Sequence, residues 1–251
     1  MNSSPFENRA PFKHLKKSEI VGGTFFDIKE VEDDPTLLVK EETTGYYGEP
    51  KVFEGAVGAQ KVISEYLVPR NIAPRQQFVQ GENEKGEKIM YVISERIQGK
   101  DLTEDVLPVI EHLDELEKFL KSLLQSSFDA SRKNVYFFIR DIRLGNVMWG
   151  RNLRNDCGET FYFVDPWPGI CLFSQEDPLA KEKFLFGLTE EKVFIITFLE
   201  RLANKVIEKF SQGSSQDREK MISIIERIDA TRKYLERMID DFVKETKKDT
   251  K

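Results

Sequence analysis

The chain has 251 residues, which suits one large domain or two smaller lobes packed together. Hydrophobic residues make up 39% of it and charged residues 33%, which provides enough apolar material for a core and excludes a wholly disordered chain. The formal net charge of −6, from 38 Lys and Arg against 44 Asp and Glu, disfavours nucleic acid as a partner.

Other broad classes are disfavoured by what the sequence lacks. No apolar run approaches the roughly 18 residues that cross a bilayer, and the beginning of the chain has no apolar stretch typical of a signal peptide. We therefore expect no membrane span and a cytoplasmic location. The 2 cysteines, Cys157 and Cys171, are expected to be free thiols there. With 2 His in the chain, zinc sites and Ser-His-Asp catalysis have little to draw on.

The N-terminal part of the sequence is rich in strand patterns. Residues 1–18 are mildly basic and are expected to form a flexible arm. The acidic turn at 32–35 and two prolines, Pro69 and Pro74, separate the elements that follow. In order, these are strands within 19–31 and at 36–40, a helix at 53–67, and two hairpin strands at 76–79 and 88–94.

The sequence after residue 97 is mainly helical. Gln98-Gly99-Lys100 breaks the strand pattern, and leucines then recur at helical spacing to Leu124. We predict an α+β fold with a small β-rich lobe containing one helix (19–97) and a larger, mainly helical lobe (98–251). Within the larger lobe we expect β-rich stretches at 135–149 and 161–165 and long amphipathic helices at 189–210 and 216–245.

The most informative residues lie at the ends of two predicted strands. One apolar strand ends in Arg140-Asp141 and is followed by Asn146, and the next ends in Asp165. A carboxylate at a strand end is held on a rigid support while it faces solvent. The oxygens of Asn146 and Asp165 are ligands of the type that Mg²⁺ prefers. Asp141 could then accept a proton from a hydroxyl group, and Arg143 could neutralise charge on a transferring phosphoryl group.

The segment from Arg140 to Asn146, followed by a strand and Asp165, resembles the catalytic loop and metal-binding Asp of the protein-kinase-like superfamily. The closest branch is the aminoglycoside and choline phosphotransferase type. Three further features match in the right order, over about residues 19–200. Residues 22–24 lie in the first hairpin, where these enzymes cover the nucleotide phosphates, and 37–40 resembles the strand that ends in the nucleotide-binding lysine. The segment 89–102 resembles the last strand, hinge and first segment of the second lobe.

This resemblance implies a role for each matching residue. Lys40 would hold the α- and β-phosphates of ATP, Asp141 would be the catalytic base, and Asn146 and Asp165 would bind Mg²⁺. Arg143 stands where protein kinases place a lysine that contacts the γ-phosphate. The remaining ATP-binding positions implied by the resemblance are Gly22, Gly23 and Thr24 in the first hairpin, Glu54 as the partner of Lys40, and Glu95 and Ile97 at the hinge.

Each position also has a purely structural explanation, and some alternatives stay open. Lys40 could be an ordinary edge-strand lysine, Asp141 and Asn146 could cap a loop, and Asp165 could cap the turn before Pro166. Glu65 lies close to three helical turns after Glu54, on the same predicted helix face. If Gln60 occupied the position that faces Lys40, the ion pair would be lost.

Departures from the family pattern define the alternatives for function. Ile139 stands where the family usually has His, the glycine-rich loop is reduced to Gly22-Gly23, and Pro166-Trp167 replaces the Phe-Gly of protein kinases. The resemblance implies an ATP- and Mg²⁺-dependent phosphotransferase that acts on a hydroxyl group. The alternatives are a pseudokinase that binds a nucleotide or a partner, and an enzyme that transfers AMP to protein.

The acceptor is expected to be a small molecule rather than a protein. The segment 175–178 resembles an acidic Asp-Pro segment of the aminoglycoside kinases. Acidic residues there would suit a cationic acceptor, although a solvated loop explains the same residues. Aromatic residues that could line a substrate cleft, or else pack between the lobes, are Trp149, Trp167, Phe173 and Phe184.

Overall fold

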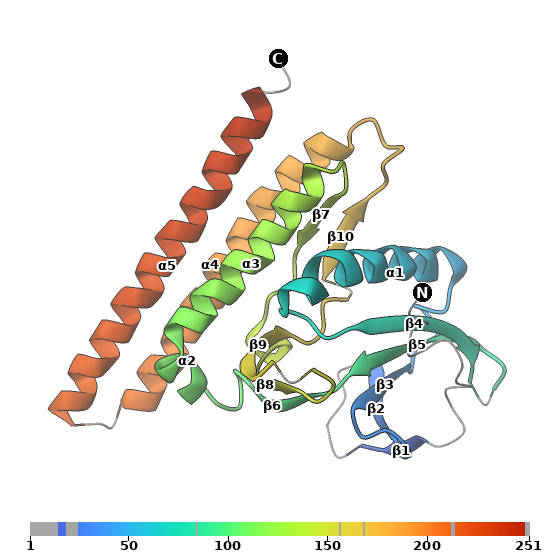
Figure 1. Ribbon diagram of the computed structural model, residues 1–251, viewed down its shortest axis with the longest axis horizontal. Coiled ribbons are helices and arrows are strands. Elements are labelled where there is room, and N and C mark those ends of the chain that lie inside the picture. The colour runs from blue at the N-terminus through green and yellow to red at the C-terminus, as the bar shows by residue number, and fades with distance from the viewer. Residues whose placement is uncertain are drawn as a thin grey trace.

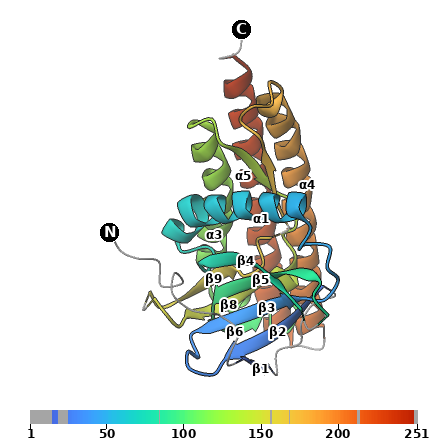
Figure 2. The same cartoon turned by 90° about the vertical axis from the view of Figure 1, so that its right-hand side faces the viewer.

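The computed structural model describes residues 15–18, 25–83, 85–155, 157–167, 169–211 and 214–248. It has the predicted α+β composition, with a β-rich N-terminal region and a helical C-terminal region (Figure 1). Helix α1 crosses one face of the N-terminal sheet, over β4 and β5 (Figure 2). The N-terminal sheet is antiparallel, with the order β1-β2-β3-β5-β4.

The strands of this sheet follow the sequence prediction with one correction. Leu15–Lys17 form β1, which pairs with β2, so the prediction of a flexible arm through residue 18 is wrong at its end. Pairing supplies backbone hydrogen bonds that the composition of this short segment does not reveal. The other four strands are β2 (Phe26–Val31), β3 (Leu37–Glu42), β4 (Gln76–Glu82) and β5 (Lys88–Glu95).

Helix α1 (Pro50–Val62) begins earlier than predicted because Pro50 occupies its first turn. Proline suits that position, since its fixed φ is helical and the N–H it lacks would be unpaired there. A π-helical turn (Ile63–Leu67) and a 3₁₀ turn (Val68–Arg70) continue the helix. Asn71, with a positive φ of 55°, then ends it in the left-handed conformation.

Strand β6 (Ile97–Asp101) contains the residues that were expected to break the β pattern, so that prediction is wrong. Gly99 stands opposite Gly150 of β8, and a Cβ atom at Gly99 would lie 2.0 Å from the carbonyl oxygen of Trp149. The glycine therefore permits a close approach of two backbones rather than a turn. Strand β6 also crosses the predicted boundary between residues 97 and 98.

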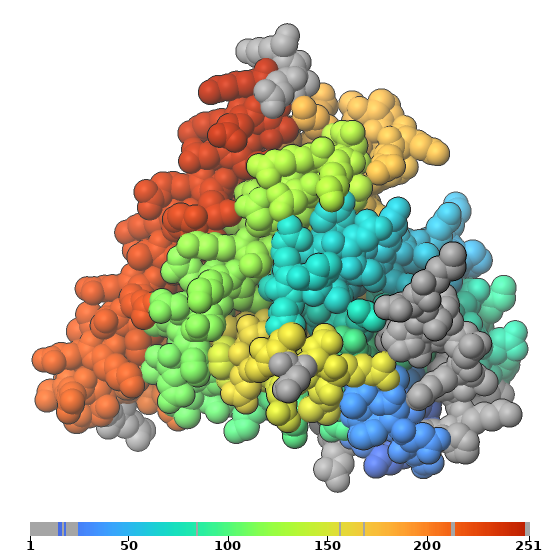
Figure 3. All heavy atoms as spheres, viewed as in Figure 1, coloured from blue at the N-terminus to red at the C-terminus, as the bar shows by residue number. Residues whose placement is uncertain are grey.

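The C-terminal region combines four helices with two small sheets. Strands β6, β8 and β9 form one sheet, and β7 and β10 form an antiparallel ribbon. Helix α5 lies along α3, and α3 lies against the π-helical turn Ile63–Leu67 that follows α1 (Figure 3). Helix α4 begins at Ala180, well before residue 189. The elements are α2 (Leu107–Glu111), α3 (Leu113–Ser131), β7 (Tyr136–Ile139), β8 (Val147–Asn152), β9 (Glu159–Phe163), β10 (Ile170–Phe173), α4 (Ala180–Phe210) and α5 (Ser215–Lys248).

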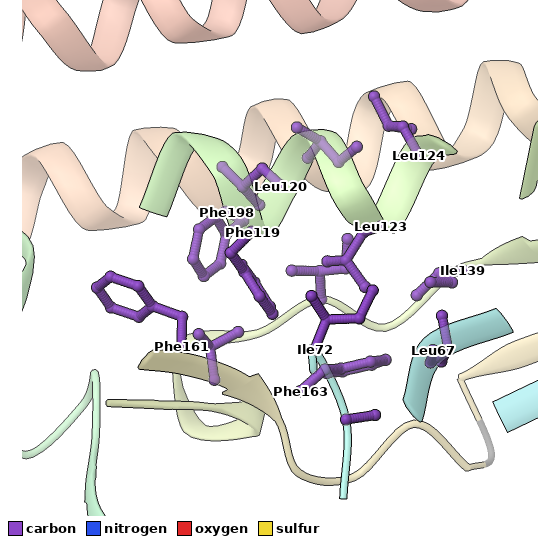
Figure 4. Packing of buried hydrophobic residues seen from close by; sticks show 14 of the residues in the cluster. Leu67, Ile72, Phe119, Leu120, Leu123, Leu124, Ile139, Phe161, Phe163 and Phe198 are labelled. Carbon is purple, nitrogen blue, oxygen red and sulfur yellow. The ribbon is translucent and has the colours of Figure 1, made fainter. Parts of the chain in front are cut away.

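One large hydrophobic cluster joins the two regions. It includes Phe78, Met90 and Val92 of the N-terminal sheet together with the inner faces of α1, α3, α4 and α5. Its centre lies where α3 packs on β9 and the end of β7 (Figure 4), with Phe119, Leu123, Ile139, Phe161 and Phe163 among the residues in contact. None of the helices in the described residues is both long enough and apolar enough to cross a membrane.

Candidate active site

The structure brings together two of the predicted site residues that lie far apart in the sequence. Lys40 of β3 and Asp165, which follows β9, are 125 residues apart, and Lys40 Nζ donates a hydrogen bond to Asp165 Oδ1 at 3.1 Å. The lysine side chain is 13% exposed and the aspartate 42%. The aspartate of the pair is therefore accessible to solvent, whereas most of the lysine side chain is covered.

The helix residues considered as partners of Lys40 lie elsewhere. Glu54 and Glu65 are both exposed, and Lys40 pairs with Asp165 instead. The prediction that Glu54 is the carboxylate partner of Lys40 is therefore wrong. Gln60 accepts a hydrogen bond from the backbone N–H of Phe78 at 2.7 Å. The side chain that faces the sheet from this part of α1 therefore holds β4 in place and does not meet the lysine.

The loop after β7 carries the other predicted catalytic residues. Arg143 Nε forms an ion pair with Asp141 Oδ1. Asn146 Nδ2 donates to the carbonyl oxygen of Asp141 at 3.2 Å. This bond orients the asparagine so that its amide nitrogen faces the loop, and its oxygen remains the atom that could ligate a cation.

Backbone hydrogen bonds join this loop to the segment that contains Asp165. Val164 N–H donates to the Asn146 carbonyl at 2.9 Å, and Arg140 N–H donates to the Gly169 carbonyl at 2.8 Å. A Cβ atom at Gly169 would lie 3.0 Å from Asp141 Cβ, so a glycine allows this contact. Asp141, Asn146 and Asp165 are therefore held on two segments that are fixed against each other.

The two residues predicted to contact ATP at the hinge are used structurally. Glu95 is 4% exposed, and its Oε2 accepts hydrogen bonds from Arg75 N–H at 3.0 Å and from Asn152 Nδ2 at 2.9 Å. Ile97 is 7% exposed and pairs with Asn152 in β6 and β8. The Glu95 carboxylate thus connects the end of β5 to the C-terminal region.

The remaining predictions concern the glycine-rich segment and the metal. Gly22, Gly23 and Thr24 lie outside the described residues. In the described part of the chain, no three or more His, Cys, Asp or Glu side chains gather as a metal cluster. The predicted ligands, Asn146 and Asp165, are one amide and one carboxylate, so they do not form such a cluster. Their oxygens are of the type that Mg²⁺ prefers. Cys157 and Cys171 are free, as predicted.

Aromatic residues pack together beside Asp165. They include Trp167, which the sequence analysis named as a possible cleft residue, and Tyr47, which it did not. Tyr47 stacks on Phe26 at 5.4 Å, and Trp167 meets Tyr47 and Phe78 edge to face at 6.5 and 6.1 Å. Burial raises the pKa of Tyr47, and the charges of Glu42 and Asp165 add to that effect. Tyr47 therefore stays a neutral phenol beside the carboxylate.

A buried carboxyl group lies behind the loop and was also missed. Glu191 of α4 is 0% exposed, and among the described residues neither of its oxygens has a hydrogen-bond partner of normal geometry. Burial raises its pKa well above the usual range, and the nearby N–H of Ile139 only partly opposes this. Its burial could have been predicted from helical spacing, because Glu191 lies on the same face of α4 as the buried residues Phe184, Leu188, Ile195 and Phe198.

A cavity of about 470 Å³ opens between the β7–β10 ribbon and the first half of α4. Arg140 is one of its lining residues and directly precedes Asp141. Phe138 and Phe173 stack at 5.9 Å in its wall. Burial raises the pKa of the Cys171 thiol there. The cavity is lined by Phe138, Arg140, Cys171, Phe173, Leu179, Glu182, Lys183, Phe186, Gly187 and Glu190.

The chain was compared with protein-family models and with curated proteins. No protein-family model matches it, and no curated protein matches it significantly.

Proposed function

We propose that the chain is an ATP- and Mg²⁺-dependent phosphotransferase with the two-lobed architecture of the protein-kinase-like superfamily. The single observation that carries this proposal is the 3.1 Å contact between Lys40 and Asp165, next to the segment that holds Asp141 and Asn146. Four residues picked out by the resemblance thus belong to one connected site. A chance resemblance would not require residues 125 positions apart to meet.

Each side chain has a place in the proposed reaction. Lys40 leaves Asp165 and holds the phosphates of ATP, which frees the Asp165 carboxylate for a cation together with the amide oxygen of Asn146. Bound there, Mg²⁺ would neutralise charge on the phosphates. Asp141 orients the acceptor hydroxyl and takes its proton. The hydroxyl oxygen forms the new bond to the γ-phosphorus, the bond from that phosphorus to the β-phosphate bridging oxygen breaks, and ADP leaves.

The proposal is tested by measuring ADP formation with Mg²⁺ and a panel of hydroxyl compounds. We expect Asp141→Ala and Asp165→Ala each to lower turnover by about 10²-fold or more, because the first removes the proton acceptor and the second a metal ligand. Asp241→Ala removes an exposed carboxylate of α5 and serves as the matched control. ATP-dependent transfer that persists in both site variants contradicts the proposal.

A second candidate is a nucleotide-binding module without turnover. It is favoured by the exposure of Glu54 and Glu65, which leaves Lys40 without a helix carboxylate among the described residues. In this case ATP raises the melting temperature of the protein, and no ADP forms with any acceptor. Formation of ADP in the wild type, lost in Asp141→Ala, separates the two candidates.

A further inference from the structure

The cavity between the β7–β10 ribbon and the first half of α4 has the size of a small-molecule site. Its volume of about 470 Å³ lies within the range in which such ligands bind. Lys40 and Asp165 are not among the residues that line it, so it is separate from the predicted nucleotide site. The chemistry of its walls therefore indicates a ligand of its own.

The floor of the cavity is apolar and aromatic. Phe138 and Cys171 pair across the ribbon, so their side chains and that of Phe173, two residues along β10, share the face that meets α4. The rings of Phe138 and Phe173 stack at 5.9 Å. Gly187 of α4 packs against Phe138, because a Cβ atom there would lie 2.3 Å from the ring. A ligand that enters the cavity therefore meets two stacked rings.

Two further apolar side chains of the lining are left in contact with water. Phe186 of α4 is 69% exposed, and Leu179, which directly precedes α4, is 49% exposed. They are seven residues apart, a spacing that places helical residues on one face. Both side chains line the cavity. A ligand with an apolar ring would cover this surface, and its removal from water favours binding.

Charged side chains of opposite sign stand on the two walls. Arg140 follows β7, Glu190 belongs to α4, and neither side chain has an ion pair or a hydrogen bond within the described part of the chain. Burial raises the pKa of the Cys171 thiol between them, while Arg140 lowers it and Glu190 raises it, so both charges are close to this sulfur. Lys183, another lining residue, already pairs with Asp177 at 2.6 Å.

An unpaired cation and an unpaired anion on facing walls suit a ligand that carries both charges. A guanidinium group binds a carboxylate through two parallel N–H bonds. An α-amino acid holds its carboxylate and its ammonium on one carbon, which leaves the side chain free to reach the floor. A simple amine would leave Arg140 unmatched, and a simple carboxylic acid would leave Glu190 unmatched.

We propose that this cavity binds an α-amino acid with an aromatic side chain. The carboxylate of the ligand pairs with Arg140, its ammonium pairs with Glu190, and its ring lies against Phe138, Phe173 and Phe186. This site goes beyond the proposed function and requires no nucleotide. Arg140 directly precedes Asp141 in the chain, so the ligand is bound beside the loop that carries the predicted catalytic base.

The test measures the dissociation constant of L-phenylalanine for the full chain by calorimetry, without nucleotide. Three comparison compounds each lack one group: phenethylamine has no carboxylate, 3-phenylpropionate has no ammonium, and L-alanine has no ring. We expect each to bind at least about 10-fold more weakly than L-phenylalanine, because a site rejects a ligand that leaves its polar groups or its apolar surface unmatched.

Two variants assign the charged groups of the ligand to their partners. Arg140→Gln should weaken L-phenylalanine at least about 5-fold without weakening phenethylamine, which has no carboxylate to lose a partner. Glu190→Gln should weaken L-phenylalanine at least about 5-fold without weakening 3-phenylpropionate, which has no ammonium. Both residues are exposed, so the variants should keep the melting temperature of the wild type.

Arg201→Gln and Glu200→Gln are the matched controls. Both residues are exposed on α4 and lie outside the cavity. Each control removes the same charge as its site variant and should leave the affinity for L-phenylalanine unchanged. Equal weakening by a site variant and its control would mean that the ligand binds elsewhere, and it would overturn the proposal.

The remaining outcomes separate this site from the proposed function. Absence of L-phenylalanine binding at millimolar concentration, or equal binding of phenethylamine and L-phenylalanine, overturns the amino acid site while ADP formation still supports the phosphotransferase. Selective binding of L-phenylalanine that both site variants weaken supports the amino acid site, even where no ADP forms with any acceptor.

Discussion

Glu191 is a buried residue whose charge state affects the stability of the fold. Burial holds its pKa well above the usual range, so the folded state binds a proton that the unfolded chain releases above about pH 4.3. A group of this kind contributes most to stability at low pH, and that contribution is lost as the pH rises through the folded pKa.

We therefore expect Glu191→Gln to become more stable than the wild type as the pH rises. The variants should have similar free energies of unfolding near pH 4, and their difference should grow by about 1.4 kcal/mol per pH unit up to the folded pKa. Urea unfolding at pH 4, 5.5 and 7 measures this difference. A wild type that gains stability relative to Glu191→Gln across that range would contradict the assignment of a neutral, buried carboxyl group.

Single residues were predicted from the sequence where a motif fixed their spacing. Lys40 and Asp165 were recognised by their positions at strand ends, and the structure brings them into contact. The predicted pairing of Lys40 with Glu54 was wrong, because the rotation of α1 over the sheet depends on packing that no local pattern records. Glu191 was missed because a glutamate is normally exposed, although its spacing along α4 is that of a core residue.

Polar contacts of Arg154 join the β2–β3 turn to the loop after β8. Arg154 forms an ion pair with Asp34 and donates from Nε to Thr36 Oγ1 at 2.9 Å. Burial alone would raise the pKa of Asp34, but the hydrogen bond from Thr36 and the charge of Arg154 outweigh it and leave the pKa below its usual range. These side chains are 12% and 21% exposed, so solvent screens the pair only in part.

Asp34→Asn should weaken the contact between residue 34 and Arg154. We expect the variant to lose about 1.5–3 kcal/mol of unfolding free energy at pH 7, the contribution of hydrogen bonds to a charged group. Because the folded pKa of Asp34 is lowered, its contribution is present above about pH 3.9 and is lost as the pH falls through the folded pKa. Unfolding at pH 7 and pH 3 should show the difference between wild type and variant shrinking. A difference that is constant with pH would mean that Asp34 acts by packing alone.

Elements with a clear period were predicted well, and elements set by partner strands were not. The amphipathic helix predicted at 216–245 corresponds to α5, and its apolar residues Ile224, Leu235 and Ile239 are buried. Strand β6 was missed since its glycine pattern resembles a turn, although Gly99 is required by the close approach to β8. Its pairing is a property of the folded molecule and leaves no periodic signal.

The continuous core predicts that the whole chain unfolds in one step. Phe242 of α5 stacks on Phe128 of α3 at 4.0 Å and an interplanar angle of 5°, inside the cluster that also reaches the N-terminal sheet. Phe242→Ala should lower the unfolding free energy by about 3–5 kcal/mol. Calorimetry should show a single transition at a lower temperature for the variant. Two transitions, with one unchanged by the substitution, would mean that the two regions unfold separately.

The overall α+β arrangement was predicted from the order of the elements. The single hydrophobic cluster that joins the two regions was not predicted. The sequence pattern indicated a small β-rich part and a larger helical part with a boundary at residues 97 and 98. The composition changes at this boundary, but the hydrophobic core continues across it. Met90 and Val92 belong to the same cluster as Leu123 and Phe163. Burial of this kind is decided by three-dimensional contacts.

The position of β6 has a practical consequence for anyone who wishes to divide this chain. A fragment that stops at Ile97 would separate that residue from the rest of its strand and would remove the asparagine that caps the Glu95 carboxylate. It would also remove the C-terminal residues of the hydrophobic cluster to which Phe78, Met90 and Val92 of the sheet belong. Proteolysis or recombinant dissection at this point should yield insoluble pieces, whereas removal of residues after Lys248 spares every described element.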